Sequence, residues 1–145
     1  MENIQRAVRE FHKKFGLLVN EKPTIPSIVD IETSANLINE EFIELLDSCS
    51  IERLDTGHIL EYKDDYKPNI IEVADALGDI LYVVMGMANR FGIDMELIFD
   101  EIHRSNMTKI GGHINENGKY IKPSTYSPAN LEPILILQGW KKDGV

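Results

Sequence analysis

The chain has 145 residues, 43% of them hydrophobic and 27% charged, which suits one globular domain spanning residues 1–145. A formal net charge of -9 argues against nucleic-acid polymers and anionic membranes as partners, and allows a phosphorylated substrate only if cations intervene. The single cysteine, Cys49, cannot form an internal disulfide, which favours a cytoplasmic location. Charged residues interrupt the N-terminal segment, so we expect no signal peptide and a soluble protein.

The first half of the chain predicts two helices. Residues 3–15 carry apolar side chains at helical spacing, and Gly16 follows as a plausible C-cap. A proline-containing loop over 17–28 leads to a second helix, which we expect to start near the N-cap residue Asp30 and to end near Ser50. The more polar stretch 51–67 is expected to hold a further short helical piece.

The second half predicts a long helix over 69–91, a stop at Gly92 and a new N-cap at Asp94. The helix that follows should end within 105–109. Asn117-Gly118 between β-prone residues indicates a hairpin, and prolines then favour an extended path before a short helix or strand over 131–137. The fold class is therefore all-α, a bundle of four to five helices with a small extended C-terminal appendage.

The long helix over 69–91 carries three acids on one side. At about 100° per residue, Glu72, Asp75 and Asp79 fall within roughly 60° of one another, and apolar residues fill most of the remaining circumference. Such a helix belongs in a core, where neighbouring carboxylates repel each other and lose hydration. A divalent cation would compensate them, unless the acids simply occupy a solvated groove.

The helix before it supplies a matching pair of acids. Glu41 and Glu44 are spaced i and i+3, as are Glu72 and Asp75, so antiparallel helices would let four carboxylates face each other. An all-oxygen site suits Mg²⁺ or Mn²⁺. A di-iron bundle would require two Glu-x-x-His elements, and the nearest match, Asp100-x-x-His103, has no twin.

Residues 104–109 supply Arg104, Ser105, Asn106, Thr108 and Lys109, a dense group of cations and donors. A solvated helix C-terminus is the simpler interpretation, because basic residues are favoured there. Beside a four-carboxylate site, contact with substrate phosphates becomes the better hypothesis. The aromatic candidates for stacking on a base are Tyr82, Phe91, His103, Tyr120, Tyr126 and Trp140, although such residues more often belong to a core or an interface.

These motifs together resemble the all-α nucleoside triphosphate pyrophosphohydrolases, a superfamily with MazG-type enzymes, dimeric dUTPases and phosphoribosyl-ATP pyrophosphohydrolases. The resemblance rests on Glu40-Glu41-Phe-Ile-Glu44, on Glu72-Val-Ala-Asp75 with Asp79 one turn later, and on Ser105-Asn-Met-Thr-Lys109. The tail 118–126 is similar to that of the phosphoribosyl-ATP branch.

The resemblance implies Mg²⁺-dependent hydrolysis of a nucleoside triphosphate between the α- and β-phosphates, with dUTP or another non-standard nucleotide as candidate substrates. A homodimer or a dimer of dimers is expected because the helix over 69–91 is apolar on more sides than one small chain can cover, and the resemblance agrees with this. The implied roles are metal ligands for Glu41, Glu44, Glu72 and Asp75, a further ion or the attacking water for Glu40, substrate contact for Asn106 and Lys109, and an extended metal site or a bundle hydrogen bond for Asp79. Phosphoribosyl-ATP hydrolysis and a non-catalytic helical metal- or partner-binding protein stay open as alternatives.

Overall fold

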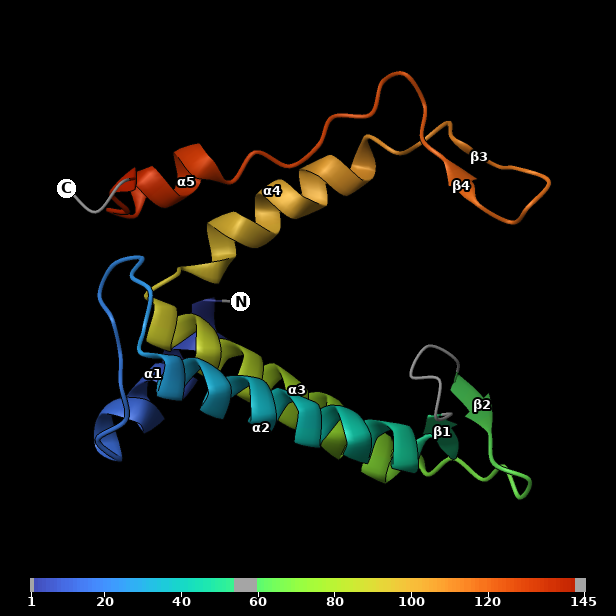
Figure 1. The fold of residues 1–145 in the computed structure, drawn as a ribbon, viewed down its shortest axis with the longest axis horizontal. Helices are drawn as coiled ribbons and strands as arrows, with labels where there is room; N and C mark the ends of the chain where they lie inside the picture. The colour runs from blue at the N-terminus through green and yellow to red at the C-terminus, as the bar shows by residue number, and fades with distance from the viewer. Residues whose placement is uncertain (1, 54–59, 143–145) are drawn as a thin grey trace.

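The computed structural model describes residues 2–53 and 60–142 (Figure 1). Within them the elements follow in the order α1 (Glu2–Lys14), α2 (Ile28–Ser48), β1 (Ile51–Arg53), β2 (Leu60–Tyr62), α3 (Ile70–Phe91), α4 (Met95–Met107), β3 (His113–Ile114), β4 (Tyr120–Ile121) and α5 (Glu132–Leu137). Helices dominate and the strands are short. The predicted all-α class with a small extended appendage is confirmed.

Helices α1, α2 and α3 pack together as one bundle, in which α2 and α3 run antiparallel (Figure 1). Contacts at the two ends of the pair fix this direction. The N–H of Asn69 donates to the Ser48 carbonyl (3.0 Å) at one end, and the Arg90 guanidinium donates to the Asp30 carbonyl (3.1 Å) at the other. The N-cap of α2 is Ser27 rather than the predicted Asp30, because the Ser27 hydroxyl accepts the Asp30 N–H.

The C-terminus of α3 ends as predicted. Gly92 adopts a left-handed conformation (φ 67°), and the Asp94 side chain then caps α4 by accepting the Glu96 N–H (2.9 Å). The loop between α1 and α2 satisfies carbonyls that a helix end leaves free: the N–H groups of Asn20 and Thr24 donate to Asn89 and Phe91. The corner between α3 and α4 is therefore held from outside as well as by its glycine.

The stretch 51–67 differs from the expectation. Instead of a helical piece, its described residues form the antiparallel pair β1–β2, with Ile51 opposite Tyr62 and Glu52 opposite Glu61. Residues 54–59, which connect the two strands in the sequence, lie outside the described residues. The Ser50 carbonyl accepts the Lys63 N–H (2.9 Å), so the pairing begins where α2 ends.

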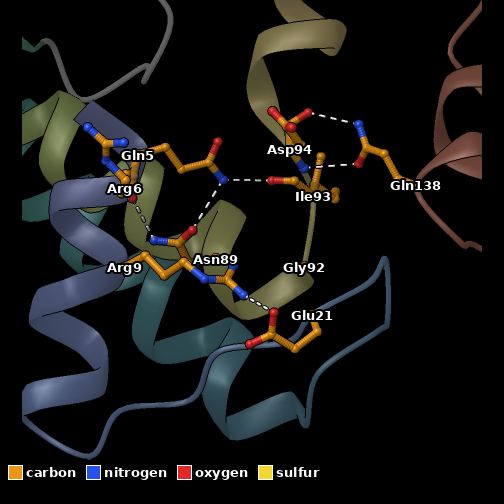
Figure 2. A pocket seen from close by; sticks show the side chains of 9 residues that line it. All are labelled: Gln5, Arg6, Arg9, Glu21, Asn89, Gly92, Ile93, Asp94 and Gln138. Atoms are coloured by element: carbon orange, nitrogen blue, oxygen red, sulfur yellow. Dashed lines mark hydrogen bonds and ion pairs between the residues drawn. The ribbon is translucent and has the colours of Figure 1, made fainter. Parts of the chain in front are cut away.

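The tail doubles back along α4 (Figure 1). The predicted hairpin is present as β3–β4, with Ile114 opposite Tyr120 and Gly118 at φ 76° in its turn. Residues 123–131 then follow an extended path to α5, the short closing helix. The Gln138 side chain forms two hydrogen bonds with the backbone of Asp94, accepting its N–H (2.9 Å) and donating to its carbonyl (3.0 Å) (Figure 2).

The same corner is held from α1. The Gln5 amide donates to the Ile93 carbonyl (2.7 Å) and to the buried Asn89 (Figure 2). It also accepts the Met95 N–H (3.0 Å). A cavity of about 390 Å³ lies here, lined mainly by polar side chains that bond one another. We interpret this junction as structural, because its principal polar groups are already paired.

The core of one chain is small. Its buried apolar side chains are Val8, Leu46, Ala76, Met85, Ala88 and Ile98. Helix α3 is expected to be apolar on more sides than one small chain can cover, and Ile70 and Ile71 are each 78% exposed, with Leu77 and Leu81 48% and 45% exposed. One chain has too few elements to cover this helix on every side. Among the described residues, no helix combines the length and apolarity needed to cross a membrane.

Candidate metal and nucleotide site

Five acids predicted from the sequence lie on the facing sides of α2 and α3. Glu41 is half-buried between the helices, and Glu40, Glu44, Asp75 and Asp79 around it are exposed. The four neighbours are close enough to raise the pKa of Glu41 electrostatically. The antiparallel pairing thus brings Glu40, Glu41 and Glu44 of α2 near Asp75 and Asp79 of α3, a group of five acids that we call the acidic seam.

The surroundings of Glu41 shift the pKa of its carboxyl. Burial raises the pKa of its carboxyl above the ordinary value, and repulsion by Glu44, Asp79, Glu40 and Asp75 raises it further. Its Oε2 atom is buried and has no hydrogen-bond partner. A buried carboxylate oxygen without a partner is costly, so this position favours a bound cation or a proton.

The acids fit a hard cation by chemistry, since every donor is a carboxylate oxygen. Among the described residues, however, no three histidine, cysteine or acidic side chains come close enough together to surround one ion. Glu72 is exposed in the first turn of α3, and its charge is not among those that shift Glu41. The ligand set of Glu41, Glu44, Glu72 and Asp75 therefore stays a prediction.

A cavity of about 340 Å³ adjoins the acidic seam. Two of its walls are facing stripes of α2 and α3, and α1 with Leu17 forms the third. The lining residues are Phe11, His12, Leu17, Ser34, Leu37, Glu41, Asp79, Tyr82, Val83, Gly86, Met87 and Arg90. Of the aromatic residues named from the sequence, Tyr82 lies here, and Phe11 packs edge-on against it at 5.7 Å between ring centroids.

Sequence reasoning missed Phe11, His12, Ser34 and Arg90 as candidate site residues. A signal for Arg90 was present. It follows Asp79 by 11 residues, which places the two within roughly 20° of each other and roughly 16 Å apart along the helix. The same spacing separates Asp30 from Glu41 on α2. A basic residue on the acidic stripe of an apolar helix could therefore have been recognised as part of the same site, at its other end.

The predicted phosphate-binding segment lies elsewhere in the chain. Helix α4 has its principal helix contact with α1 and leads away from the α2–α3 pair (Figure 1). Lys109 donates to the Asn106 side chain (2.8 Å) near the end of α4. One chain therefore does not bring Asn106 and Lys109 to the acidic seam.

Arg104 is engaged by its own chain. Its guanidinium forms two bonds to the Glu101 carboxylate (2.7 and 2.8 Å) and reaches Ser127 and the Pro128 carbonyl in the tail. These contacts fasten the tail to α4. A role of Arg104 in substrate binding stays a prediction, and it would have to compete with these partners.

The Glu101–Arg104 pair predicts a pH effect. Arg104, followed by the Asn130 N–H, lowers the pKa of Glu101 from 4.5 to about 2, and the Glu101 side chain is only 16% exposed. A depressed folded-state pKa adds stability that is present above about pH 4.5 and is lost as the pH falls toward 2. We expect Glu101→Gln to melt below the wild type at pH 7, with the gap narrowing between pH 4.5 and 2. Asp100→Asn, an exposed neighbour, is the control for thermal melts across this range, and a gap independent of pH would contradict the ion pair.

An antiparallel helix pair with Glu-x-x-Glu on one helix and Glu-x-x-Asp on the other is the arrangement expected of an all-α nucleotide pyrophosphohydrolase. The sequence pattern of the phosphoribosyl-ATP pyrophosphohydrolase family matches residues 8–106, more than half of the chain. The chain belongs to this family, whose enzymes are hydrolases acting on phosphoanhydride bonds and typically depend on a divalent metal.

A curated relative is similar over 63% of the chain. It is described as "Uncharacterized protein L479" of Acanthamoeba polyphaga mimivirus and is 33% identical over 95 residues. The match covers 63% of this chain and 32% of the relative, so the chain spans about a third of that protein's length. The relative's name adds no activity.

Proposed function

We propose that this protein hydrolyses a nucleoside triphosphate or deoxynucleoside triphosphate between the α- and β-phosphates, releasing the monophosphate and pyrophosphate. The observation that carries the proposal is the buried Glu41 oxygen without a partner, set among four other carboxylates at the mouth of a cavity. Membership of the pyrophosphohydrolase family supports the same reaction. A deaminated or otherwise non-standard nucleotide such as dUTP is the favoured substrate.

The residues divide the chemistry among themselves. Glu41, Glu44, Glu72 and Asp75 would hold Mg²⁺, with Mn²⁺ as a substitute, and Asp79 would extend this set or orient it. When bound, the cations would offset the phosphate charge and polarise the scissile bond. Glu40 or Glu41 would accept a proton from the attacking water, whose oxygen ends on one of the two products, the monophosphate or pyrophosphate.

A second copy of the chain would complete this site. Large apolar side chains are exposed along α2, α3 and α4, among them Phe42, Leu81 and Phe99. We infer a homodimer or a dimer of dimers in which a partner covers α3 and brings its own Asn106 and Lys109 to the seam. Light scattering across the micromolar range should give at least twice the chain mass, and Leu81→Glu should lower it. A monomeric wild type would exclude this assembly.

Phosphoribosyl-ATP is a second candidate substrate, because the matching family takes its name from it. The acidic seam would serve either reaction in the same way, since both break a bond between phosphates. A deciding difference would lie in the groups that contact the base and sugars. The acids cannot separate the two substrates.

Release of pyrophosphate from a panel of ribo- and deoxynucleoside triphosphates and phosphoribosyl-ATP tests the proposal. We expect turnover with Mg²⁺, slower or equal turnover with Mn²⁺, and none with excess EDTA. Turnover of phosphoribosyl-ATP alone would select the second candidate. Cation binding without turnover of any nucleotide would instead support a metal-sequestering protein.

A further inference from the structure

The cavity beside the acidic seam has two chemically different ends. Glu41 and Asp79 lie at one end, and Arg90, paired with Ser34 across the helices, lies at the other. Phe11 and Tyr82 contribute aromatic side walls between them. A cavity of about 340 Å³ is within the range that holds small organic ligands. Its order of acids, aromatic wall and buried cation matches a ligand with phosphates at one end and a flat polar ring at the other.

Arg90 is buried and incompletely bonded. It is 8% exposed, and its Nη1 atom donates to the Asp30 carbonyl and the Ser34 hydroxyl, both at 3.1 Å. Its Nε–H is also buried and has no partner. Because an unpaired buried donor on a charged group is costly, the position indicates an acceptor that a ligand would supply.

His12, which lines the same cavity as Arg90, supplies a hydrogen-bond acceptor. The Nδ1 atom lies 3.2 Å from the Leu18 carbonyl, which can only accept, so Nδ1 carries the hydrogen. Burial, opposed by the Leu18 bond and assisted by the Arg90 charge, lowers the pKa of His12 and keeps the ring neutral. Nε2 is then an acceptor. It lies against Gly86, where an added Cβ would come within 3.0 Å of it.

We propose that Arg90 and His12 select nucleotides whose base carries a carbonyl next to a ring N–H, namely uracil, thymine, hypoxanthine or guanine. The Arg90 Nε–H donates to the carbonyl oxygen, and the His12 Nε2 accepts the ring N–H. This inference rests on the proposed function, since it assigns the base end of the same site.

Amino bases invert both contacts. Cytosine and adenine present an amino group where the keto bases have an oxygen, and a bare ring nitrogen where they have N–H. The Nε–H of Arg90 would then face a donor, and Nε2 of His12 would face an acceptor. Sites that hydrogen-bond one polarity reject the other strongly, because their buried groups are left unpaired. Stacking on Phe11 or Tyr82 would favour every base alike and add no preference.

Matched nucleotide pairs test the proposal. We expect kcat/KM for dUTP to exceed that for dCTP, and ITP to exceed ATP, each by about 30-fold or more. Arg90→Lys retains a charge that can reach Ser34 but removes the Nε–H, and it should reduce both ratios to within about threefold, by slowing the keto substrate. Arg9→Lys makes the same change at an arginine paired with Glu21 and should leave both ratios as in the wild type.

Binding of products separates this inference from the proposed reaction. Calorimetry with dUMP and dCMP in EDTA requires neither metal nor turnover, and should show dUMP binding at least about tenfold more tightly, a difference lost in Arg90→Lys. Preferential dUMP binding without any hydrolysis would uphold the inference and overturn the proposed function. Hydrolysis with equal ratios for keto and amino bases, or ratios unchanged in a folded Arg90→Lys, would overturn the inference alone.

Discussion

Replacing Glu41 by glutamine should reduce kcat/KM for pyrophosphate release by roughly 10³-fold or more while the protein still folds. Glutamine has nearly the same shape as glutamate but cannot hold a cation with a charged oxygen or accept the proton of a water. The Oε2 of Glu41 is buried without a protein partner, so the substitution breaks no hydrogen bond of this atom within the protein. Its effect is on the cation or water bound at the acidic seam. Initial rates with Mg²⁺, alongside circular dichroism of the variant, measure both parts of the expectation.

The same variant has a second expected property that a structural acid would not share. Burial and four neighbouring carboxylates raise the pKa of Glu41, so its charge destabilises the metal-free fold. Glu41→Gln should therefore melt above the wild type in EDTA at neutral pH. Glu32→Gln, an exposed acid on the same helix, should change neither activity nor melting. Full activity in a folded Glu41→Gln, or a lower melting temperature without metal, would remove Glu41 from the site.

Asp75→Asn applies the same reasoning to the facing helix. Asp75 is exposed on α3 and is one of the charges that raise the pKa of Glu41. If the two helices share one site, both substitutions should abolish turnover, and the double variant should lose little more than either single one, because residues that act as a unit are not additive. Independent partial losses would place the two acids in separate roles.

The fold was predictable wherever a local signal determines local structure. Gly92 and Asp94 end one helix and start the next through their own backbone and side-chain preferences, and Asn117-Gly118 marks a turn for the same reason. The approach of Asp75 and Asp79 to Glu41 follows from helical periodicity and antiparallel packing. These inferences need no knowledge of distant contacts.

The remaining features depend on partners far along the chain. The strand pair β1–β2 is stabilised by hydrogen bonds between segments that have little apolar alternation, so its composition resembled a polar helical turn. The cavity requires Phe11 to lie against Tyr82 and His12 to lie against Gly86, contacts between α1 and α3 that periodicity does not encode. Arg90 does not stand out as a site residue in the sequence, because basic residues are common in the last turn of a helix.

The segment 104–109 illustrates a third limit. Its composition indicated phosphate contact, and its position beside the acids was inferred from resemblance. In one chain, α4 leads away from the seam, and Arg104 is bonded to Glu101 and the tail. A sequence read as a single chain cannot show which residues meet across a subunit boundary. The assembly and the site are therefore coupled hypotheses.

Gly92→Ala should destabilise the protein by roughly 3–4 kcal/mol. Gly92 has φ +67°, a conformation that costs a residue with a Cβ roughly 1–2 kcal/mol. The added Cβ would also lie 2.6 Å from the Lys22 carbonyl carbon, a backbone atom that cannot turn aside. The loop holding Lys22 would have to move, and with it the bonds from Asn20 and Thr24 that close the end of α3.

Gly16→Ala separates the two causes of this loss. Gly16 has nearly the same φ, +68°, but an added Cβ there would meet no atom within 4 Å. Urea unfolding should therefore show a loss of about 1 kcal/mol for Gly16→Ala, and the excess at Gly92 measures the clash alone. Equal losses at the two positions would mean that the loop yields freely. The α3–α4 corner would then be held by Gln5 and Gln138 rather than by the close approach of Lys22 to Gly92.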